Sequence, residues 1–218
     1  MALLNFKQRV TYKLIGSYMR ASEYIMQACK KNAIVLHFTA GYGDAIGVGK
    51  FFEYLKGMVA TCYACGRDGL IAEFFPPAYW AYHLGSTIYN EMRTIGIEIV
   101  NIGPLWAKGG LLYDAYGNKY TGEYITLKTP YKGVLYFATF TEEQYENVGK
   151  WAAERCIAFG IPPVINSNLD YVVDNEKLVG ITTHTHFRQD KYDIGPAWDW
   201  AKFKGYFDAE YARLKAAA

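Results

Sequence analysis

The four histidines of the chain are the residues whose type and placement could carry the most chemistry. His37 lies near the end of an apolar run, 33–41, that is typical of a buried strand followed by a loop. His184 and His186 lie near the end of a second strand-like run, 178–187. A catalytic zinc needs about three protein ligands and one open position for water. Two histidines at strand ends and a carboxylate from the following loop therefore predict a metal site.

The residues alone leave the ligand set open. His184 and His186 are two positions apart, so on a strand both point to the same face, and either or both could bind a metal. Asp190 and Asp193 both follow, and either could supply the carboxylate. Two roles are open for His83: it could line a groove and touch substrate, or it could make structural hydrogen bonds.

The elements that must position these residues alternate between strands and helices, which predicts an α/β fold. We expect a single domain with a mixed central β-sheet flanked by helices and with the metal site at strand ends. Residues 1–32 are expected to form a helical segment packed on a domain of residues 33–218. The expected helices are 4–30, 48–58, 141–159 and 198–214, and the expected strands are 33–41, 59–65, 70–75, 94–103 and 178–187, with a further hairpin over 111–127.

Composition narrows the class of protein. The chain has 218 residues, 51% of them hydrophobic and 20% charged, which is ordinary for a soluble globular domain. A net charge of +2 is too small to argue for nucleic-acid binding, and no stretch approaches the roughly 18 apolar residues of a membrane span. Cys62 and Cys65 form a C-x-x-C without a second pair, so we expect free thiols in a reducing compartment. The start of the chain lacks the apolar core of a signal peptide, so we expect synthesis in the cytoplasm. We also expect the protein to be a monomer.

Four blocks of sequence occur in an order that points to one family. They are IVLHFTAG (34–41), GRDGLIAEFFPPAYWAYHLG (66–85), TIGIEIVN (94–101) and THTHFRQDKYDIGPAWDW (183–200). Together they resemble the zinc-dependent N-acetylmuramoyl-L-alanine amidases of the type 2 family, which include phage endolysins, bacterial recycling amidases and animal peptidoglycan recognition proteins. The resemblance spans roughly residues 33 to 203 and implies that 33–218 is a zinc amidase domain.

The resemblance implies a role for each matching residue. His37, His184 and Asp193 fall on the zinc ligands, which leaves His186 outside the metal's ligand set. Glu98 falls on the acid that activates water, and Lys191 falls on the catalytic lysine. Some members carry a tyrosine before the R-D-G turn where Thr61 stands here, so a tyrosine role is doubtful.

The implied reaction is hydrolysis of the amide between N-acetylmuramic acid and L-alanine in peptidoglycan. We expect His83 and Trp80, in the second block, to contact the peptidoglycan or muropeptide. A phage-type endolysin that acts on the cell wall fits best. The alternatives are a cytosolic amidase that recycles muropeptides, and a module on the same fold that binds peptidoglycan without cutting it. The five residues in the ligand and catalytic positions favour an enzyme.

Overall fold

A six-stranded mixed sheet forms the body of the protein. The computed structural model describes residues 12–217, and the strands of this sheet follow the order β1-β4-β3-β5-β2-β11. All neighbours run parallel except β3 and β4, which lie in the expected strands 59–65 and 70–75 and form a hairpin around the Gly66–Gly69 turn. The mixed sheet confirms the predicted fold class. The bounds are β1 (Leu14–Gly16), β2 (Ala33–Phe38), β3 (Tyr63–Cys65), β4 (Ile71–Glu73), β5 (Thr94–Ile99) and β11 (Gly180–Thr183).

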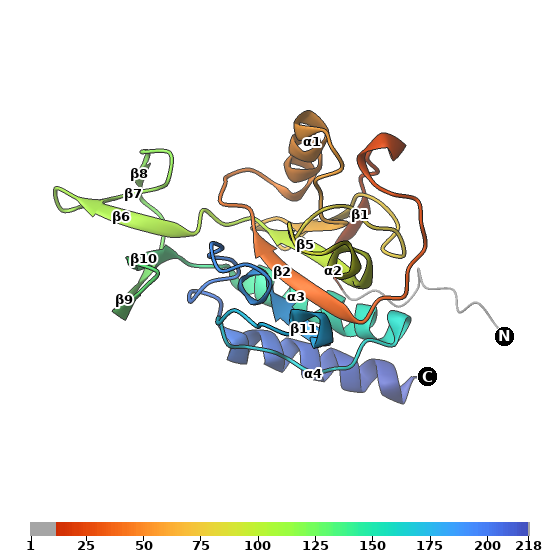
Figure 1. The fold of residues 1–218 in the computed structure, drawn as a ribbon. Coiled ribbons are helices and arrows are strands. Elements are labelled where there is room, and N and C mark those ends of the chain that lie inside the picture. Colours follow the sequence, from red (N-terminus) through yellow and green to blue (C-terminus); the bar gives the residue numbers. More distant parts are fainter. Residues whose placement is uncertain (1–11, 218) are drawn as a thin grey trace.

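Helices cover both faces of this sheet (Figure 1). The helices α3 (Glu142–Phe159) and α4 (Trp200–Ala216) pack together below the sheet in that view, and α1 (Ala45–Leu55) lies above it. Below the sheet, the ring of Trp151 meets that of Tyr63 at 5.0 Å, and above it Phe52 meets Phe74 at 6.0 Å. A short helix, α2 (Ile88–Arg93), precedes β5. Among the described residues no helix combines the length and apolar character that crossing a membrane requires.

The helix expected over 141–159 is confirmed as α3. Thr141 caps the helix by accepting a hydrogen bond from the Gln144 backbone N–H, and the Gln144 side chain bonds back to the Thr141 backbone. The helix ends at Gly160, whose φ of 65° lies in the left-handed region that glycine adopts at low cost.

The prediction of a helix over 4–30 is wrong for the residues that the structure describes. Residues 1–11 lie outside the described part, and from Tyr12 onward the chain forms the strand β1 and a 3-10 turn at Ala21–Glu23. The strand β1 adds to the edge of the sheet beside β4, and Tyr12 and Met19 are buried in the core. This segment does pack on the body, but tertiary pairing overrides a helical pattern that Gly16 already weakens. The division at residue 32 stays a prediction.

A second sheet of five antiparallel strands, which we call the projecting sheet, extends from the body at the left of Figure 1. The hairpin expected over 111–127 forms at its turn, where the Gly117 N–H donates to Asp114 O at 3.1 Å. The sequence did not predict the rest, because these strands pair with partners outside that hairpin. The bounds are β6 (Pro104–Lys108), β7 (Leu111–Tyr113), β8 (Lys119–Tyr120), β9 (Tyr124–Tyr131) and β10 (Val134–Ala138).

The two cysteines of the C-x-x-C are buried thiols. Cys62, Cys65 and the other two cysteines are free in the described chain. Burial raises the pKa of Cys62 to about 12, so this thiol stays protonated and behaves as a small apolar side chain.

Candidate metal centre and active site

Parallel strand pairing places three of the predicted residues side by side. His37 on β2 is the register partner of Glu98 on β5. Thr183, the last residue of β11, pairs with Leu36, so His184 follows beside His37. Leu36 packs in the main core, and alternation along the strand therefore sends His37 to the opposite face.

The residue Asp193 arrives on the loop that follows β11. Its carbonyl accepts a hydrogen bond from the Thr185 backbone N–H at 3.1 Å, and the Ile194 N–H donates to the Thr183 hydroxyl. These two bonds hold the far end of the loop against the end of β11. The carboxylate is thereby brought against His184, nine residues earlier in the chain.

The structure separates the candidate metal ligands that the sequence left open. The strand ends at Thr183 and residues 184–186 form a 3-10 turn, so the expectation that His184 and His186 share a strand face is wrong. The His186 ring is instead bound by Thr182 and by Asn168, whose Oδ1 lies 2.6 Å from Nε2. Asp190 is exposed and pairs with Arg188. Neither residue belongs to the cluster around His37.

Three buried ligand atoms meet at one point. The Nδ1 of His37 lies 3.0 Å from the Nδ1 of His184 and 3.0 Å from Oδ2 of Asp193, and His184 Nδ1 lies 2.9 Å from that oxygen. Ligand atoms bound to one tetrahedral zinc would stand about 3.3 Å apart. Two imidazole nitrogens and a carboxylate oxygen at this spacing fit a catalytic zinc, whose fourth position stays open.

The orientation of His184 is held by a turn built on a buried acid. The His184 Nε2 lies 2.8 Å from the carbonyl oxygen of Leu84, which can only accept, so Nε2 carries the proton and Nδ1 keeps its lone pair. The carboxylate of Glu91 accepts from the backbone N–H groups of His83 at 2.9 Å, Leu84 at 3.0 Å and Ser86 at 3.2 Å. Glu91 therefore fixes the carbonyl that fixes His184.

A chain of hydrogen bonds also determines which ring nitrogen of His37 carries the proton. Thr94 Oγ1 donates to the Asn90 carbonyl at 2.7 Å, so it accepts from His83 Nε2 at 2.9 Å. Nδ1 of His83 is then an acceptor for the Nε2–H of His37, 3.0 Å away. The Nδ1 of His37 is left free to face the cluster. Such outer hydrogen bonds orient metal-binding histidines and raise their basicity.

Gly96 makes room for this chain of hydrogen bonds, and the sequence analysis did not identify it. A Cβ at this position on β5 would lie 2.8 Å from His83 Nδ1 and 2.8 Å from Thr61 Cγ2. The signal was present, because a glycine inside a β-branched strand often marks a close approach of another group. The supporting roles of Glu91 and Thr94 carried no such signal.

The charges of the cluster suit metal binding. Burial, and then the neighbouring His184, lower the pKa of His37 to about 4. Burial opposes the ionisation of Asp193, but its contacts with His184 and His37 hold its pKa well below the usual range. At neutral pH the site thus offers a neutral His37 and an ionised Asp193, the forms that bind a metal.

The acid predicted to activate water stands beside the cluster. Burial, and then the charge of Asp193, raise the pKa of Glu98 to about 8, while Lys191 acts in the opposite direction. Its Oε2 is buried and has no hydrogen-bond partner among residues 12–217. Glu98 lines a cavity of about 320 Å³ with Tyr42, Phe51 and other residues. The positive charge of Lys191 also lowers the pKa of His37.

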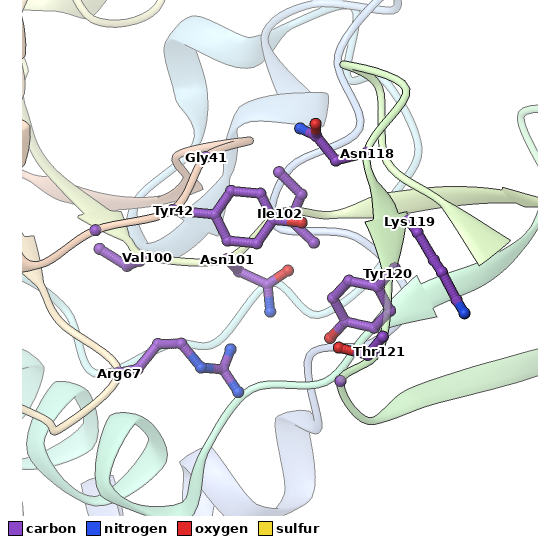
Figure 2. A pocket seen from close by; sticks show the side chains of 12 residues that line it. Gly41, Tyr42, Arg67, Val100, Asn101, Ile102, Asn118, Lys119, Tyr120 and Thr121 are labelled. Atoms are coloured by element: carbon purple, nitrogen blue, oxygen red, sulfur yellow. The ribbon is translucent and has the colours of Figure 1, made fainter.

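A second cavity of about 440 Å³ adjoins the first and shares Gly41 and Tyr42 with it. Figure 2 shows the ring of Tyr42 at its edge and the guanidinium of Arg67 directed toward Tyr120 and Thr121. One wall comes from the body and the other from the projecting sheet. Two tyrosines join them: Tyr42 donates to Asp114 at 2.8 Å, and Tyr116 donates to the Ala40 carbonyl at 2.9 Å.

The two residues expected to touch substrate, His83 and Trp80, make contacts within the protein instead. His83 is partly buried and contacts His37 and Thr94, as in its structural alternative. The indole of Trp80 is buried; its Nε1 donates to Gln27 at 3.2 Å, and it does not join the cluster. A substrate role for either residue stays a prediction.

We expect the His83→Ala variant to bind zinc about 10–100-fold more weakly, because the acceptor that orients His37 is lost. The His83→Asn variant should retain most of the affinity, since Asn Oδ1 can accept the same hydrogen bond. Competition with a chromophoric chelator measures both. Equal affinity of His83→Ala and the unmodified protein would show that His83 does not position His37.

Comparisons with known proteins identify the family of the chain and structures that share its fold. A model of the N-acetylmuramoyl-L-alanine amidase family matches residues 28–196. None of the curated proteins matches the chain by sequence. Among solved structures, the hydrolase AmiA of Staphylococcus aureus, in complex with its ligand, is 14% identical, over 94% of this chain and 85% of that chain, with a TM-score of 0.56.

Two further structures share the fold. A mutant endolysin from Bacillus subtilis is 14% identical, over 90% of this chain and 99% of that chain, with a TM-score of 0.54. The N-acetylmuramyl-L-alanine amidase AmiD from E. coli is 19% identical, over 83% of this chain and 59% of that chain, with a TM-score of 0.52. At these identities the likeness shows the fold alone.

Proposed function

This chain belongs to the N-acetylmuramoyl-L-alanine amidase family, and from that premise we propose that it is a zinc-dependent enzyme that cuts polymeric peptidoglycan, as a phage-type endolysin does. The bond cut is the amide between N-acetylmuramic acid and L-alanine. The observation that carries the proposal is the buried cluster of His37, His184 and Asp193, whose ligand atoms lie 2.9–3.0 Å apart.

The cluster supplies the ligands, and the neighbouring residues supply the proton transfers. His37 Nδ1, His184 Nδ1 and Asp193 Oδ2 would hold the metal. A zinc ion bound there would lower the pKa of a bound water toward neutrality and would polarise a carbonyl group. The orienting bonds to Leu84 and His83 keep both imidazoles in the tautomer that binds.

The residue Glu98 would act as general base and then as general acid. Its carboxylate accepts a proton from water as the water oxygen bonds to the carbonyl carbon. When the carbon–nitrogen bond breaks, Glu98 donates that proton to the leaving nitrogen of L-alanine. Among the described residues nothing competes for the buried Oε2, and the raised pKa brings the carboxyl close to neutral pH, where both transfers are efficient. The Lys191 ammonium would stabilise the negative charge on the former carbonyl oxygen.

The shape of the cleft favours a polymer over a soluble fragment. The Glu98 cavity continues into the second cavity, and together they run between the body and the projecting sheet. Tyr42, Phe51 and Tyr116 line the first cavity and are 61%, 56% and 68% exposed. Exposed rings of this kind can stack on sugar faces, so the cleft suits a glycan strand with its attached peptides.

The test uses purified peptidoglycan and mass spectrometry of the products, with and without a chelator. We expect peptides that begin with L-alanine to be released from intact sacculi, and release to stop on chelation and return with zinc. Soluble anhydro-muropeptides should be cut more slowly than sacculi. Cleavage of the muropeptides alone would instead identify a recycling amidase, and cleavage that persists after complete removal of the metal would refute the zinc mechanism.

A further inference from the structure

We propose that Lys132, at the tip of the β9–β10 hairpin of the projecting sheet, is a positioning residue for the loop that carries Lys191 and Asp193. The inference rests on the proposed function, because that loop matters through its metal ligand and its catalytic lysine. The hairpin belongs to the projecting sheet, whereas the other bonds that hold the cluster come from the body.

The Lys132 ammonium is bound to the loop directly. It donates to the Gln189 carbonyl at 2.7 Å and to the carbonyl of Lys191. Both acceptors are main-chain atoms, so the bonds hold the backbone of the loop, independent of its side chains. The second acceptor belongs to the residue expected to face the oxyanion and lies two residues before the metal ligand Asp193.

Aromatic contacts reinforce this attachment. The Lys132 Nζ lies 5.5 Å from the ring centre of Tyr131 and 5.7 Å from that of Tyr192, within the range of a cation–π interaction. The Tyr192 hydroxyl donates to the Lys132 carbonyl at 3.3 Å. The hairpin tip therefore donates hydrogen bonds to the loop and accepts one from it. The residue that donates, Tyr192, immediately precedes Asp193 in the chain.

The backbone of the tip is unusual for the residue that occupies it. Lys132 has a φ of 49° and Gly133 a φ of 82°. Tight hairpin turns of this kind normally use asparagine or glycine at the first position, because a longer side chain makes a positive φ costly. A lysine at this position makes the turn less stable than asparagine or glycine would. Its side chain, however, carries an ammonium that reaches the loop.

The neighbouring Tyr131 extends the contact toward the metal ligand. Its buried hydroxyl faces the buried side chain of Thr185, whose N–H binds the Asp193 carbonyl. Its ring meets that of Tyr192 at 6.4 Å. The hairpin tip thus adjoins the loop from Gln189 to Asp193, and fixing such a loop in advance favours both metal binding and catalysis.

The experiment compares Lys132→Met, which removes the charge and keeps most of the side-chain length, with Lys128→Met, which removes an exposed lysine of β9, the strand that leads to the tip. Hydrogen exchange of the Thr185 and Ile194 amides is measured in metal-free protein, since these N–H groups bind the two ends of the loop. Zinc affinity is measured by chelator competition, and kcat and KM on peptidoglycan fragments.

For Lys132→Met we expect roughly tenfold faster exchange at these amides, about tenfold weaker zinc binding and a lower kcat at nearly unchanged KM. Lys128→Met should match the unmodified protein, and Lys132→Arg, which keeps the donors, should restore much of the loss. Unchanged exchange and zinc affinity in Lys132→Met would overturn the inference, as would a fall in thermal stability alone. If the unmodified protein neither bound zinc nor cut peptidoglycan, the proposed function would fail, while the exchange comparison would still decide the role of Lys132.

Discussion

The Glu98→Gln variant is expected to lose about 10²–10⁴-fold in kcat while keeping its zinc. The amide has nearly the shape of the carboxylate but cannot take the proton from water or return it to the leaving nitrogen. Glu98 lies beside His37 in register and does not belong to the ligand cluster, so metal binding should survive. Release of L-alanine peptides and metal content per chain are the two measurements.

The matched control is Glu123→Gln, which changes an exposed acid just before β9 and should leave kcat unaltered. A second readout follows from the pKa of Glu98, which rises from 4.5 to about 8 on folding in metal-free protein. Between these values the folded chain holds a proton that the unfolded chain has lost, so stability falls as pH rises through this window. Glu98→Gln should remove this fall in the melting temperature. A kcat within threefold of the unmodified protein would exclude Glu98 as the base.

The Asp193→Ala variant is expected to lose both zinc and hydrolysis. Asp193 Oδ2 is the atom that both histidines share, so its removal takes away one ligand and the charge that balances the metal. The loss of affinity should exceed the ~10–100-fold typical of an outer hydrogen-bond partner. Metal content after dialysis and product release from sacculi measure the two effects.

The control for this substitution is Asp190→Ala in the same loop. Asp190 is exposed and pairs with Arg188, and it was the alternative carboxylate in the sequence. It should keep zinc and activity near those of the unmodified protein. Hydrolysis that persisted in Asp193→Ala, or that vanished in Asp190→Ala with zinc lost, would show that the carboxylate was assigned wrongly.

Much of the fold could be predicted where the signals are local. The capping box at Thr141 and the glycine at 160 define α3 because backbone groups at helix ends are satisfied by nearby residues. The hairpin around Gly66–Gly69 follows from its turn residues in the same way. The segment 12–30 and the projecting sheet could not be predicted, because their strands exist only through pairing with distant partners.

For the site, the sequence by itself determined the residue types that could bind zinc and move a proton, and the resemblance selected His37, His184, Asp193, Glu98 and Lys191 from the open alternatives. The tertiary structure decided what depends on where chains meet. The end of β11 at Thr183 separates His184 from His186. The space left by Gly96 turns His83 into a partner of His37. The tip at Lys132 holds a loop more than fifty residues away, a contact that no local pattern encodes because it forms only when two segments distant in the chain pack together.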